Sequence, residues 1–301
     1  MVFGGGDDWM AALATYADAI PAAVAHPDAD VVMAALDKVE LARRAPAAGL
    51  TAPRTEPATA AALASWAGPV VVKSRAHWHR GLRHELRIEA RRYADVATAM
   101  PRVQRLTKAG LRPVLQEPVD GTLEALVGLV HDGRLLGRLR QRSLALWPTP
   151  SGVTCRAETL AVDEDLARGA VALLADLRWS GLVQLQFLRD RRGVPHLIDL
   201  NGRFFGSMAL TVAAGANLPD AWGRQALGED LPDLPDGRPG VRFLWAAGDL
   251  RRARIERRGG VLADAGSLLR WLPGAVTSVW DPRDPRPTAT LVRERLRPRG
   301  R

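Results

Sequence analysis

Cysteine, lysine and long apolar runs are scarce in this sequence of 301 residues, and each scarcity excludes a class of protein. Cys155 is the single cysteine, so neither an intramolecular disulfide nor a zinc site built on cysteines can form, which indicates a reducing compartment. No apolar run approaches the roughly 18 to 20 residues of a transmembrane helix, and residues 1–10 lack the regions of a secretory signal. We therefore expect a cytoplasmic protein with no membrane partner.

Lysine is the scarcest charged residue. Only Lys38, Lys73 and Lys108 are lysines among 42 basic residues, so arginine fills the ordinary surface positions and each lysine draws attention. The net charge is +9, and residues 238–301 carry 15 Arg against 6 Asp and Glu, a surplus that equals it. Such a tail can attract phosphate polymers, but a solvated basic face is the commoner explanation, so we do not expect a nucleic-acid partner.

The spacing of apolar residues predicts a mixture of helices and strands. Hydrophobic residues make up 47% of the chain and charged residues 25%, values typical of a globular protein with a sizeable core. Up to residue 48, apolar residues recur three and four apart, which predicts helices. The run of valines before Lys73 predicts a strand that ends at this lysine, and Asp132 with Gly133 predicts a two-residue hairpin turn.

A second predicted hairpin, residues 182–201, aligns polar groups on one face. Because side chains alternate along a strand, Asp199 and Asn201 share a face that Arg203 continues, and Gln186 on the partner strand can face Asp199. Such groups are costly to bury without partners, so their alignment indicates a ligand or water. Oxygen donors of this kind suit Mg²⁺, and an arginine suits a transferred phosphate. An ordinary solvent-facing hairpin remains the alternative.

Further stretches precede this hairpin in a characteristic order. They are LDK at residues 36–38 followed by LARRAPAAGLTAPRT, PVVVKS ending in Lys73, LQEPVDG at residues 115–121, and Glu124 seven residues after Glu117. Together with LVQLQF and LIDLNGRFFGS, they resemble the ATP-grasp superfamily, in particular the carboligase-like branch related to the carbamoyl phosphate synthetase large subunit. The resemblance extends from Asp37 to Pro219.

The resemblance implies an α+β fold, the ATP-grasp fold, in which two α/β sub-domains clasp ATP and Mg²⁺ or Mn²⁺. It also implies a role for each matching residue: Lys38 and Lys73 contact phosphates, Glu117 takes the adenine amino group, the Val119 backbone meets the ring edge, Glu124 binds the ribose, Gln186, Asp199 and Asn201 carry the metal, and Arg203 clamps the transferred phosphate.

The activity that the resemblance implies is ATP-dependent ligation. A small carboxylate substrate attacks the γ-phosphate to give an acyl phosphate and ADP, and an amine or a similar nucleophile then displaces phosphate. The alternative is a non-catalytic ATP-binding or regulatory subunit. Two departures favour that alternative, because most relatives have Glu at the positions of Gln186 and Asp199, and less negative charge weakens a divalent metal site.

The resemblance also sets domain boundaries. We expect residues 1–36 to be a helical remnant of a preceding domain, residues 37–230 to be the ATP-grasp domain, and residues 231–301 to be a basic C-terminal extension. Relatives begin with a further domain that is largely missing here, so we expect either a partner protein that supplies it or a chain that is a fragment of a longer protein.

Three alternatives concern other phosphate or metal contacts. A glycine-rich flap over the phosphates is expected in residues 74–81 or near Ser151 and Gly152, although neither stretch is rich in glycine. Arg140 and Arg142 share a strand face and can reach phosphate or pair with surface acids. His77 and His79 share a strand face as a metal pair would, but like charges surround them and argue against a metal. His84 is the only nearby third ligand, and the like charges are Arg75, Arg80 and Arg83, which could instead cover the triphosphate.

Overall fold

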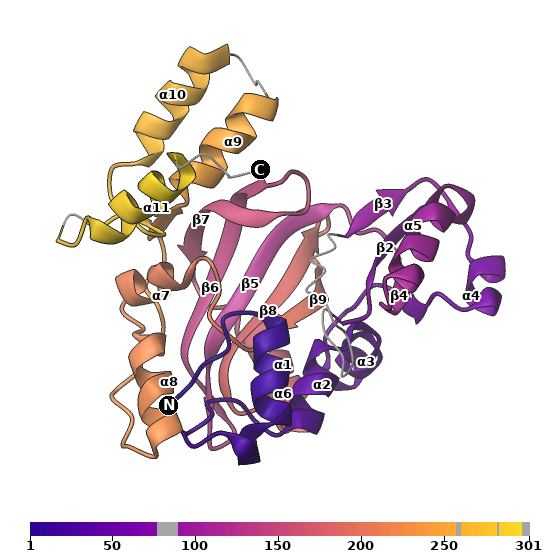
Figure 1. The fold of residues 1–301 in the computed structure, drawn as a ribbon, viewed down its shortest axis with the longest axis horizontal. Helices are drawn as coiled ribbons and strands as arrows, with labels where there is room; N and C mark the ends of the chain where they lie inside the picture. The colour runs from indigo at the N-terminus through magenta and orange to yellow at the C-terminus, as the bar shows by residue number, and fades with distance from the viewer. Residues whose placement is uncertain (77–89, 257–259, 282, 297–301) are drawn as a thin grey trace.

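The computed structural model describes residues 1–76, 90–256, 260–281 and 283–296, and Figure 1 shows its two β-sheets lying side by side. The α+β architecture expected from the sequence is confirmed. Residues 77–89, which include His77, His79 and His84 and most of the arginines near them, lie outside the described part. Within the described residues, no helix is long and apolar enough to cross a bilayer.

The larger sheet has seven strands in the order β11-β10-β7-β6-β5-β8-β9, and all neighbours are antiparallel except β10 and β11. The strands are β5 (Gly121–His131), β6 (Arg134–Trp147), β7 (Val153–Leu160), β8 (Gly181–Asp190), β9 (Pro195–Asn201), β10 (Arg242–Leu244) and β11 (Ala275–Thr277). The predicted turn joins β5 to β6, where Asp132 and Gly133 have φ of 48° and 73°, as a two-residue hairpin requires. β9 is an edge strand, so its last residues are open to neighbouring elements.

The smaller sheet is antiparallel, with the order β1-β4-β2-β3. It contains β1 (Thr55–Pro57), β2 (Val70–Ser74), β3 (Arg91–Tyr93) and β4 (Pro113–Gln116), and it packs against α4 (Ala60–Ser65) and α5 (Val96–Lys108). Val70 and Val72 pack in the core with Val103 and Leu106 of α5. Because side chains alternate along a strand, Lys73 points to the opposite face, away from these helices.

Helices from the start of the chain cover one face of the larger sheet. They are α1 (Asp7–Thr15), α2 (Ala29–Leu36) and α3 (Lys38–Arg44), with short 3₁₀ turns η1 (Ala17–Ala19) and η2 (Ala45–Ala48), and they lie beside α6 (Glu164–Asp176). Met10, Leu36 and Leu41 share one buried cluster with Leu126 and Leu185 of the sheet. The first 36 residues therefore belong to the main core.

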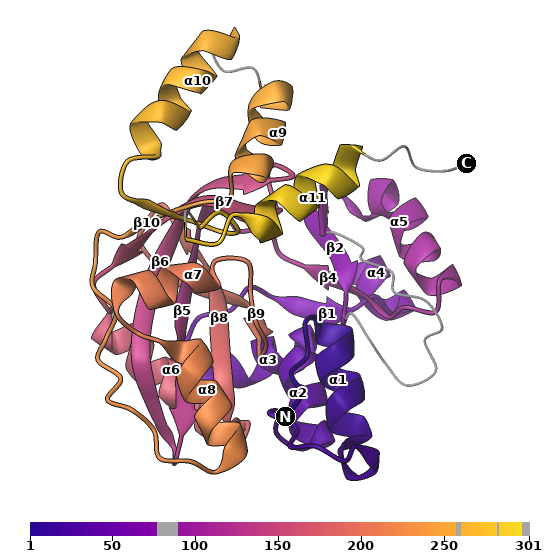
Figure 2. The ribbon, with the colours of Figure 1, turned by 60° about the vertical axis from the view of Figure 1, so that its left-hand side comes forward.

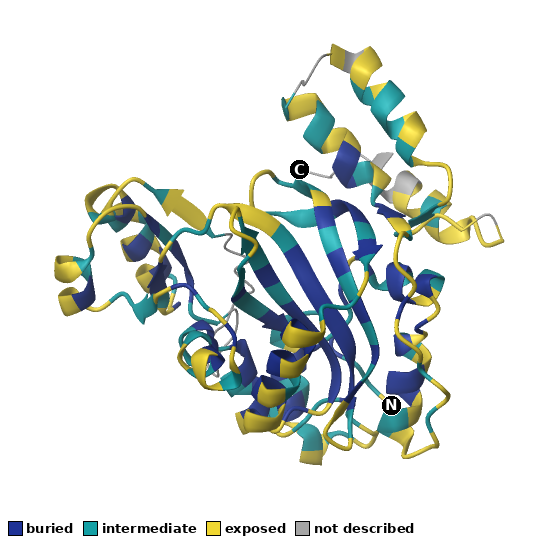
Figure 3. Ribbon diagram, turned by 180° about the vertical axis from the view of Figure 1, so that it is seen from behind, coloured by how far each residue is buried: buried dark blue, intermediate teal, exposed yellow. Residues whose placement is uncertain are grey.

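The opposite face of the sheet carries α7 (Met208–Ala214) and α8 (Leu218–Leu227). Trp222 of α8 is buried against Phe3 and Phe204, with ring centroids 4.6 Å and 5.1 Å away. Figure 3 shows the strands of the larger sheet as the most buried part of the molecule, between these two helical layers.

The last part of the chain joins the sheet and then projects from it. β10 and β11 extend the larger sheet beyond β7. Figure 1 and Figure 2 show α9 (Ala246–Glu256) and α10 (Gly260–Trp271) extending outward from this end of the sheet, with α11 (Arg286–Leu296) below them. Asp249 of α9 accepts from Arg156 of β7 at 2.6 Å and from Arg252 at 2.9 Å, and this buried pairing fastens the base of the projecting helices.

Gly202, directly after β9, is required by close packing. A Cβ at this position would lie 2.1 Å from Cζ2 and 2.2 Å from Cη2 of Trp179, whose indole is buried in the main core. The backbone between Asn201 and Arg203 therefore rests directly on the Trp179 ring.

We expect Gly202→Ala to lower the free energy of unfolding by roughly 1–3 kcal/mol, because the rigid indole must move to admit the methyl group. Chemical denaturation followed by tryptophan fluorescence measures this change. Gly5→Ala is the matched control, since a Cβ there meets nothing within 4 Å. Equal stability of the two variants would show that the Trp179 ring is not held in place.

Candidate functional site

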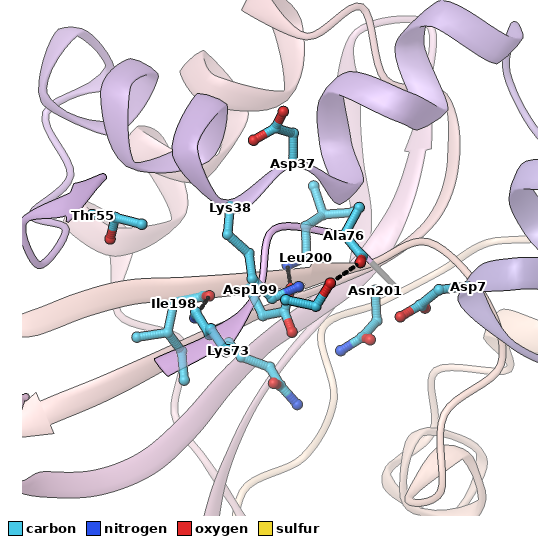
Figure 4. Close-up of polar contacts among 12 residues, drawn as sticks. Asp7, Asp37, Lys38, Thr55, Lys73, Ala76, Ile198, Asp199, Leu200 and Asn201 are labelled. Atoms are coloured by element: carbon cyan, nitrogen blue, oxygen red, sulfur yellow. Dashed lines mark hydrogen bonds and ion pairs between the residues drawn. The ribbon is translucent and has the colours of Figure 1, made fainter. Parts of the chain in front are cut away.

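Polar residues from four elements meet at the end of β9. β2 of the smaller sheet supplies Lys73, whose Nζ donates to the carbonyl oxygen of Ile198 in β9 at 3.2 Å (Figure 4). This hydrogen bond links the two sheets across the edge of the larger one. The lysine predicted from the valine run therefore lies beside the strand that carries the predicted metal ligands.

Lys38 approaches the same strand from α3. The Asp37 carboxylate caps this helix by accepting from the backbone of Val39 at 2.9 Å and of Glu40 at 3.2 Å. Its other oxygen accepts from Nε of Arg75 at 2.7 Å. These bonds fix the first turn so that Lys38 Nζ lies 3.2 Å from Oδ1 of Asp199, with only 3% of the lysine side chain exposed.

Two lysines thus lie at the same part of β9: Lys38 pairs with the Asp199 carboxylate, and Lys73 donates to the neighbouring Ile198 carbonyl oxygen. Burial, together with the positive charge of nearby Lys38, lowers the pKa of Lys73 to about 7, although the Asp199 carboxylate acts in the opposite direction. A cation kept in so little water favours an anionic partner, because charge burial is offset only by opposite charge. The pair of lysines is suited to an anion with several negative oxygens, such as a phosphate chain.

The remaining polar residues of β8 and β9 form one chain of hydrogen bonds. Oε1 of Gln184 accepts from Nε2 of Gln186 at 3.4 Å and from Nδ2 of Asn201 at 3.0 Å. Oδ1 of Asn201 accepts from Nη2 of Arg203 at 3.1 Å. Gln184 therefore orients both amides, a role that the sequence did not assign to it, although strand alternation places it on the same face.

The chain of hydrogen bonds ends on a residue that the sequence analysis missed. Nε of Arg203 donates to Oδ1 of Asp7, the first residue of α1, at 2.6 Å. Figure 4 shows Asp7 facing the end of β9 near Asn201. Acidic residues are common in the first turn of a helix, so no local pattern could have distinguished Asp7.

The donor set of Gln186, Asp199 and Asn201 fits a magnesium ion that arrives with phosphates. Two amides and one carboxylate are hard oxygen donors, and Mg²⁺ is usually held by one or two carboxylates plus substrate phosphates. Within the described residues, no group of three or more His, Cys, Asp or Glu side chains could hold a metal unaided. Because Lys38 already neutralises Asp199, this site offers little attraction to a bare cation.

The residues expected around the nucleoside do not form one group. Glu117 and Val119 lie in the linker between β4 and β5, where the Glu117 side chain is exposed. Glu124 lies in β5 on the face that packs against α6, and its carboxylate is only 4% exposed. It accepts from Arg140 at 2.9 Å and from Arg189 at 2.8 Å, so the structure does not bring it into the site.

The alternative for Arg140 and Arg142 receives a structural answer, whereas that for the phosphate flap stays open, because most of residues 74–81 lie outside the described part. Arg140 pairs with Glu124, and Arg142 of the same strand pairs with Glu158, so both arginines bind acids of the sheet. Ser151 lies in the turn between β6 and β7, where its hydroxyl donates to the Ala90 carbonyl oxygen at 3.4 Å. This turn therefore approaches the smaller sheet at the end of the 77–89 segment.

We expect Lys73→Met to raise the free energy of unfolding at pH 7 by roughly 2–5 kcal/mol, because it removes a buried cation. The folded-state pKa of Lys73 lies below the unfolded value, so the unfolded wild type binds more protons between about pH 7 and pH 10.5, and its stability rises with pH across this window. The advantage of the variant should therefore shrink toward pH 10.

Urea denaturation at pH 6, 7, 8.5 and 10 measures this difference. Lys108→Met at the exposed end of α5 is the matched control, for which we expect a small change at every pH. A Lys73→Met variant less stable than the wild type, or a difference that does not change with pH, would contradict the burial argument.

Comparison with known proteins gives one match to a family model. The model is described as ATP-grasp in the biosynthetic pathway with Ter operon, and it matches residues 149–248, which run from the end of β6 into α9. No curated protein matches this chain in sequence.

Several solved structures share the fold. An L-amino acid ligase from Bacillus licheniformis is 17% identical, with a TM-score of 0.54, covering 69% of this chain and 50% of that one. The biotin carboxylase domain of the Hydrogenobacter thermophilus 2-oxoglutarate carboxylase, solved with MgADP, ADP and bicarbonate, is 15% identical, with a TM-score of 0.59, covering 73% and 51%. A D-alanine–D-alanine ligase from Bacillus anthracis is 14% identical, with a TM-score of 0.53, covering 74% and 77%.

The chain spans about half the length of the first two of these proteins. Identities this low establish the fold alone. The chain therefore has the ATP-grasp fold, and the family model together with these structures supports its place in the ATP-grasp superfamily.

Proposed function

We propose that this protein is an ATP- and Mg²⁺-dependent ligase that joins a carboxylate to an amine or a similar nucleophile through an acyl phosphate. The observation that carries the proposal is that two buried lysines meet on β9 where the two sheets adjoin, Lys38 at the Asp199 carboxylate and Lys73 at the Ile198 carbonyl oxygen. The L-amino acid ligase and the D-alanine–D-alanine ligase have the same fold and are named for reactions of this class.

In this proposal the two lysines bind the phosphate chain of ATP. Lys73 is held by the rigid strand β2, and Lys38 by the capped first turn of α3, so neither needs to reorganise when the anion arrives. Phosphate oxygens would place negative charge next to the buried ammonium group of Lys73. Glu117 and the Val119 backbone, in the linker between the sheets, take the adenine.

Asp199, Gln186 and Asn201 would hold Mg²⁺ together with the phosphates. When bound, the ion neutralises charge on the transferred phosphoryl group. Gln184 keeps the amide oxygen of Gln186 available by accepting a hydrogen bond from its amide nitrogen. The glutamine at this position favours the branch related to the carbamoyl phosphate synthetase large subunit.

The reaction needs no nucleophile from the protein. A substrate carboxylate oxygen attacks the γ-phosphorus, the bond to the β,γ-bridging oxygen breaks, and ADP leaves. An amine then attacks the acyl carbon, inorganic phosphate leaves with the bonding electron pair, and the nitrogen releases one proton to water as the amide forms. Arg203 stabilises the charge on the phosphoryl group during both steps, as phosphoryl transfer requires.

A non-catalytic ATP-binding subunit is the second candidate function. The observation that favours it is that Asp199 is the single carboxylate of the donor set and is already paired with Lys38. Such a protein would bind MgATP and release no ADP. We propose residues 37–230 as the nucleotide-binding unit in either case.

We expect isothermal titration calorimetry to detect ATP binding that depends on Mg²⁺, and no binding of Mg²⁺ alone, because the bare site has no surplus of negative charge. Lys73→Met should weaken MgATP binding by about 10- to 100-fold, the loss expected for one charged hydrogen bond of roughly 1.5–3 kcal/mol. Lys108→Met should bind as the wild type does. A folded wild-type protein that does not bind MgATP would refute both candidate functions.

We expect Asp199→Asn to reduce ADP release by at least about 100-fold, because it removes the one carboxylate of the metal site. The assay follows ADP in the presence of panels of carboxylates and amines. Asp165→Asn, at a fully solvated position of α6, should retain the wild-type rate. An unchanged rate in Asp199→Asn would disprove the metal assignment, whereas MgATP binding without ADP release in the wild type would favour the non-catalytic function.

A further inference from the structure

α1 enters the site from a part of the chain that the proposed reaction does not use. Asp7, Met10, Ala11 and Ala14 recur at the spacing of one helical face. Met10, Ala11 and Ala14 are buried in the main core, and Asp7 continues this face at the start of the helix. The packing that holds α1 against the sheet therefore also positions the Asp7 carboxylate at the site.

The segment before α1 is held by a hydrogen bond to His26 and by close packing against the first turn of the helix. The Gly4 amide donates to Nε2 of His26 at 2.8 Å, and burial lowers the pKa of His26 to about 4, which keeps the imidazole a neutral acceptor. A Cβ at Gly4 would lie 2.6 Å from the backbone nitrogen of Met10, so the chain needs glycine to turn into the helix here.

The contact between Asp7 and Arg203 leaves part of the guanidinium available. Three hydrogen bonds are found among the described residues: Nε donates to Asp7 at 2.6 Å, Nη1 to the Phe204 carbonyl oxygen at 3.0 Å, and Nη2 to Asn201 at 3.1 Å. A guanidinium carries five N–H groups, so two remain for an anion. The Arg203 side chain is 22% exposed, and the Asp7 side chain 10%.

We propose that Asp7 is a positioning residue of the phosphate site, which holds the Arg203 guanidinium in the orientation that receives the terminal phosphoryl group. This inference rests on the proposed function. An unrestrained arginine side chain explores many rotamers, and a bond to Nε removes most of that freedom before the anion arrives. In this role Asp7 acts through Arg203 and touches no reacting atom.

Two other roles of Asp7 would change nucleotide affinity differently. If Asp7 instead competed with the phosphoryl group for Arg203, its removal would free the guanidinium and tighten binding of a nucleotide with a γ-phosphate. A purely structural role in α1 would change stability and leave the preference for a γ-phosphate unaltered.

The test compares the affinities of the full-length protein for the Mg²⁺ complexes of ADP and of a non-hydrolysable β,γ-imido analogue of ATP. Calorimetry gives both constants for the wild type, Asp7→Ala, Asp7→Asn, Arg203→Ala and the double variant Asp7→Ala with Arg203→Ala. Asp8→Asn, next in the same first turn, is the matched control. Thermal unfolding of each variant shows that the comparison is made on folded protein.

We expect Arg203→Ala and Asp7→Ala each to reduce the preference for the analogue over ADP by about tenfold, with affinity for MgADP within about twofold of the wild type. The double variant should lose no more than either single variant, because both changes act on one contact. Asp7→Asn should keep part of the preference, since its amide oxygen can still accept from Nε. If Asp7→Ala does not fold, the comparison of Asp7→Asn with the wild type provides the test.

Two results would overturn the inference while the proposed function stands. One is an unchanged or stronger preference for the analogue in Asp7→Ala and Asp7→Asn, when Arg203→Ala has lost it. The other is the same loss in Asp8→Asn as in Asp7→Asn. Absence of binding of both Mg²⁺–nucleotide complexes in the folded wild type would instead refute the proposed function, and the inference with it.

Discussion

The organisation of the site depends on two buried lysines that lie near one carboxylate, of which only Lys38 is paired with it. Lys38 and Lys73 come from different layers, α3 and β2, and meet at the edge strand of the larger sheet beside Asp199. Each lysine is held in place by the structure around it, so neither side chain can move its amino group into water. Burying positive charge in this way has a free-energy cost, which binding of an anionic ligand would offset.

This constraint explains why the metal and the nucleotide have to be considered together. A site with two carboxylates and no cation attracts Mg²⁺ by itself, whereas here the charge on Asp199 is matched by Lys38. The phosphates of a nucleotide would supply negative charge to the lysines and oxygen ligands to the metal at the same time. The replacement of glutamate by Gln186 is then compatible with metal binding, because the ligand brings the missing charge.

Sequence patterns predicted what depends on local periodicity. Strand alternation placed Gln186, Asp199 and Asn201 on one face, and the structure has Gln186 opposite Asp199 and Gln184 opposite Asn201. The same reasoning could not predict that Glu124 is bound by Arg140 and Arg189, since which of many arginines reaches a given acid depends on the register and the packing of distant strands. The contact of Asp7 with Arg203 joins residues 196 positions apart, and no spacing rule covers such a distance.

Several of the first 36 residues pack in the main core with residues of the larger sheet. Met10, Val32 and Leu36 share a buried cluster with the sheet and with Trp179, and the Trp179 ring in turn supports Gly202, between Asn201 and Arg203. Removing α1 would expose that cluster and undermine the backbone of the site, so loss of activity after truncation would say nothing about Asp7. A single carboxylate exchanged for its amide keeps the packing of the helix face and changes one charge. The contribution of α1 to chemistry can therefore be separated from its contribution to folding only at Asp7 itself.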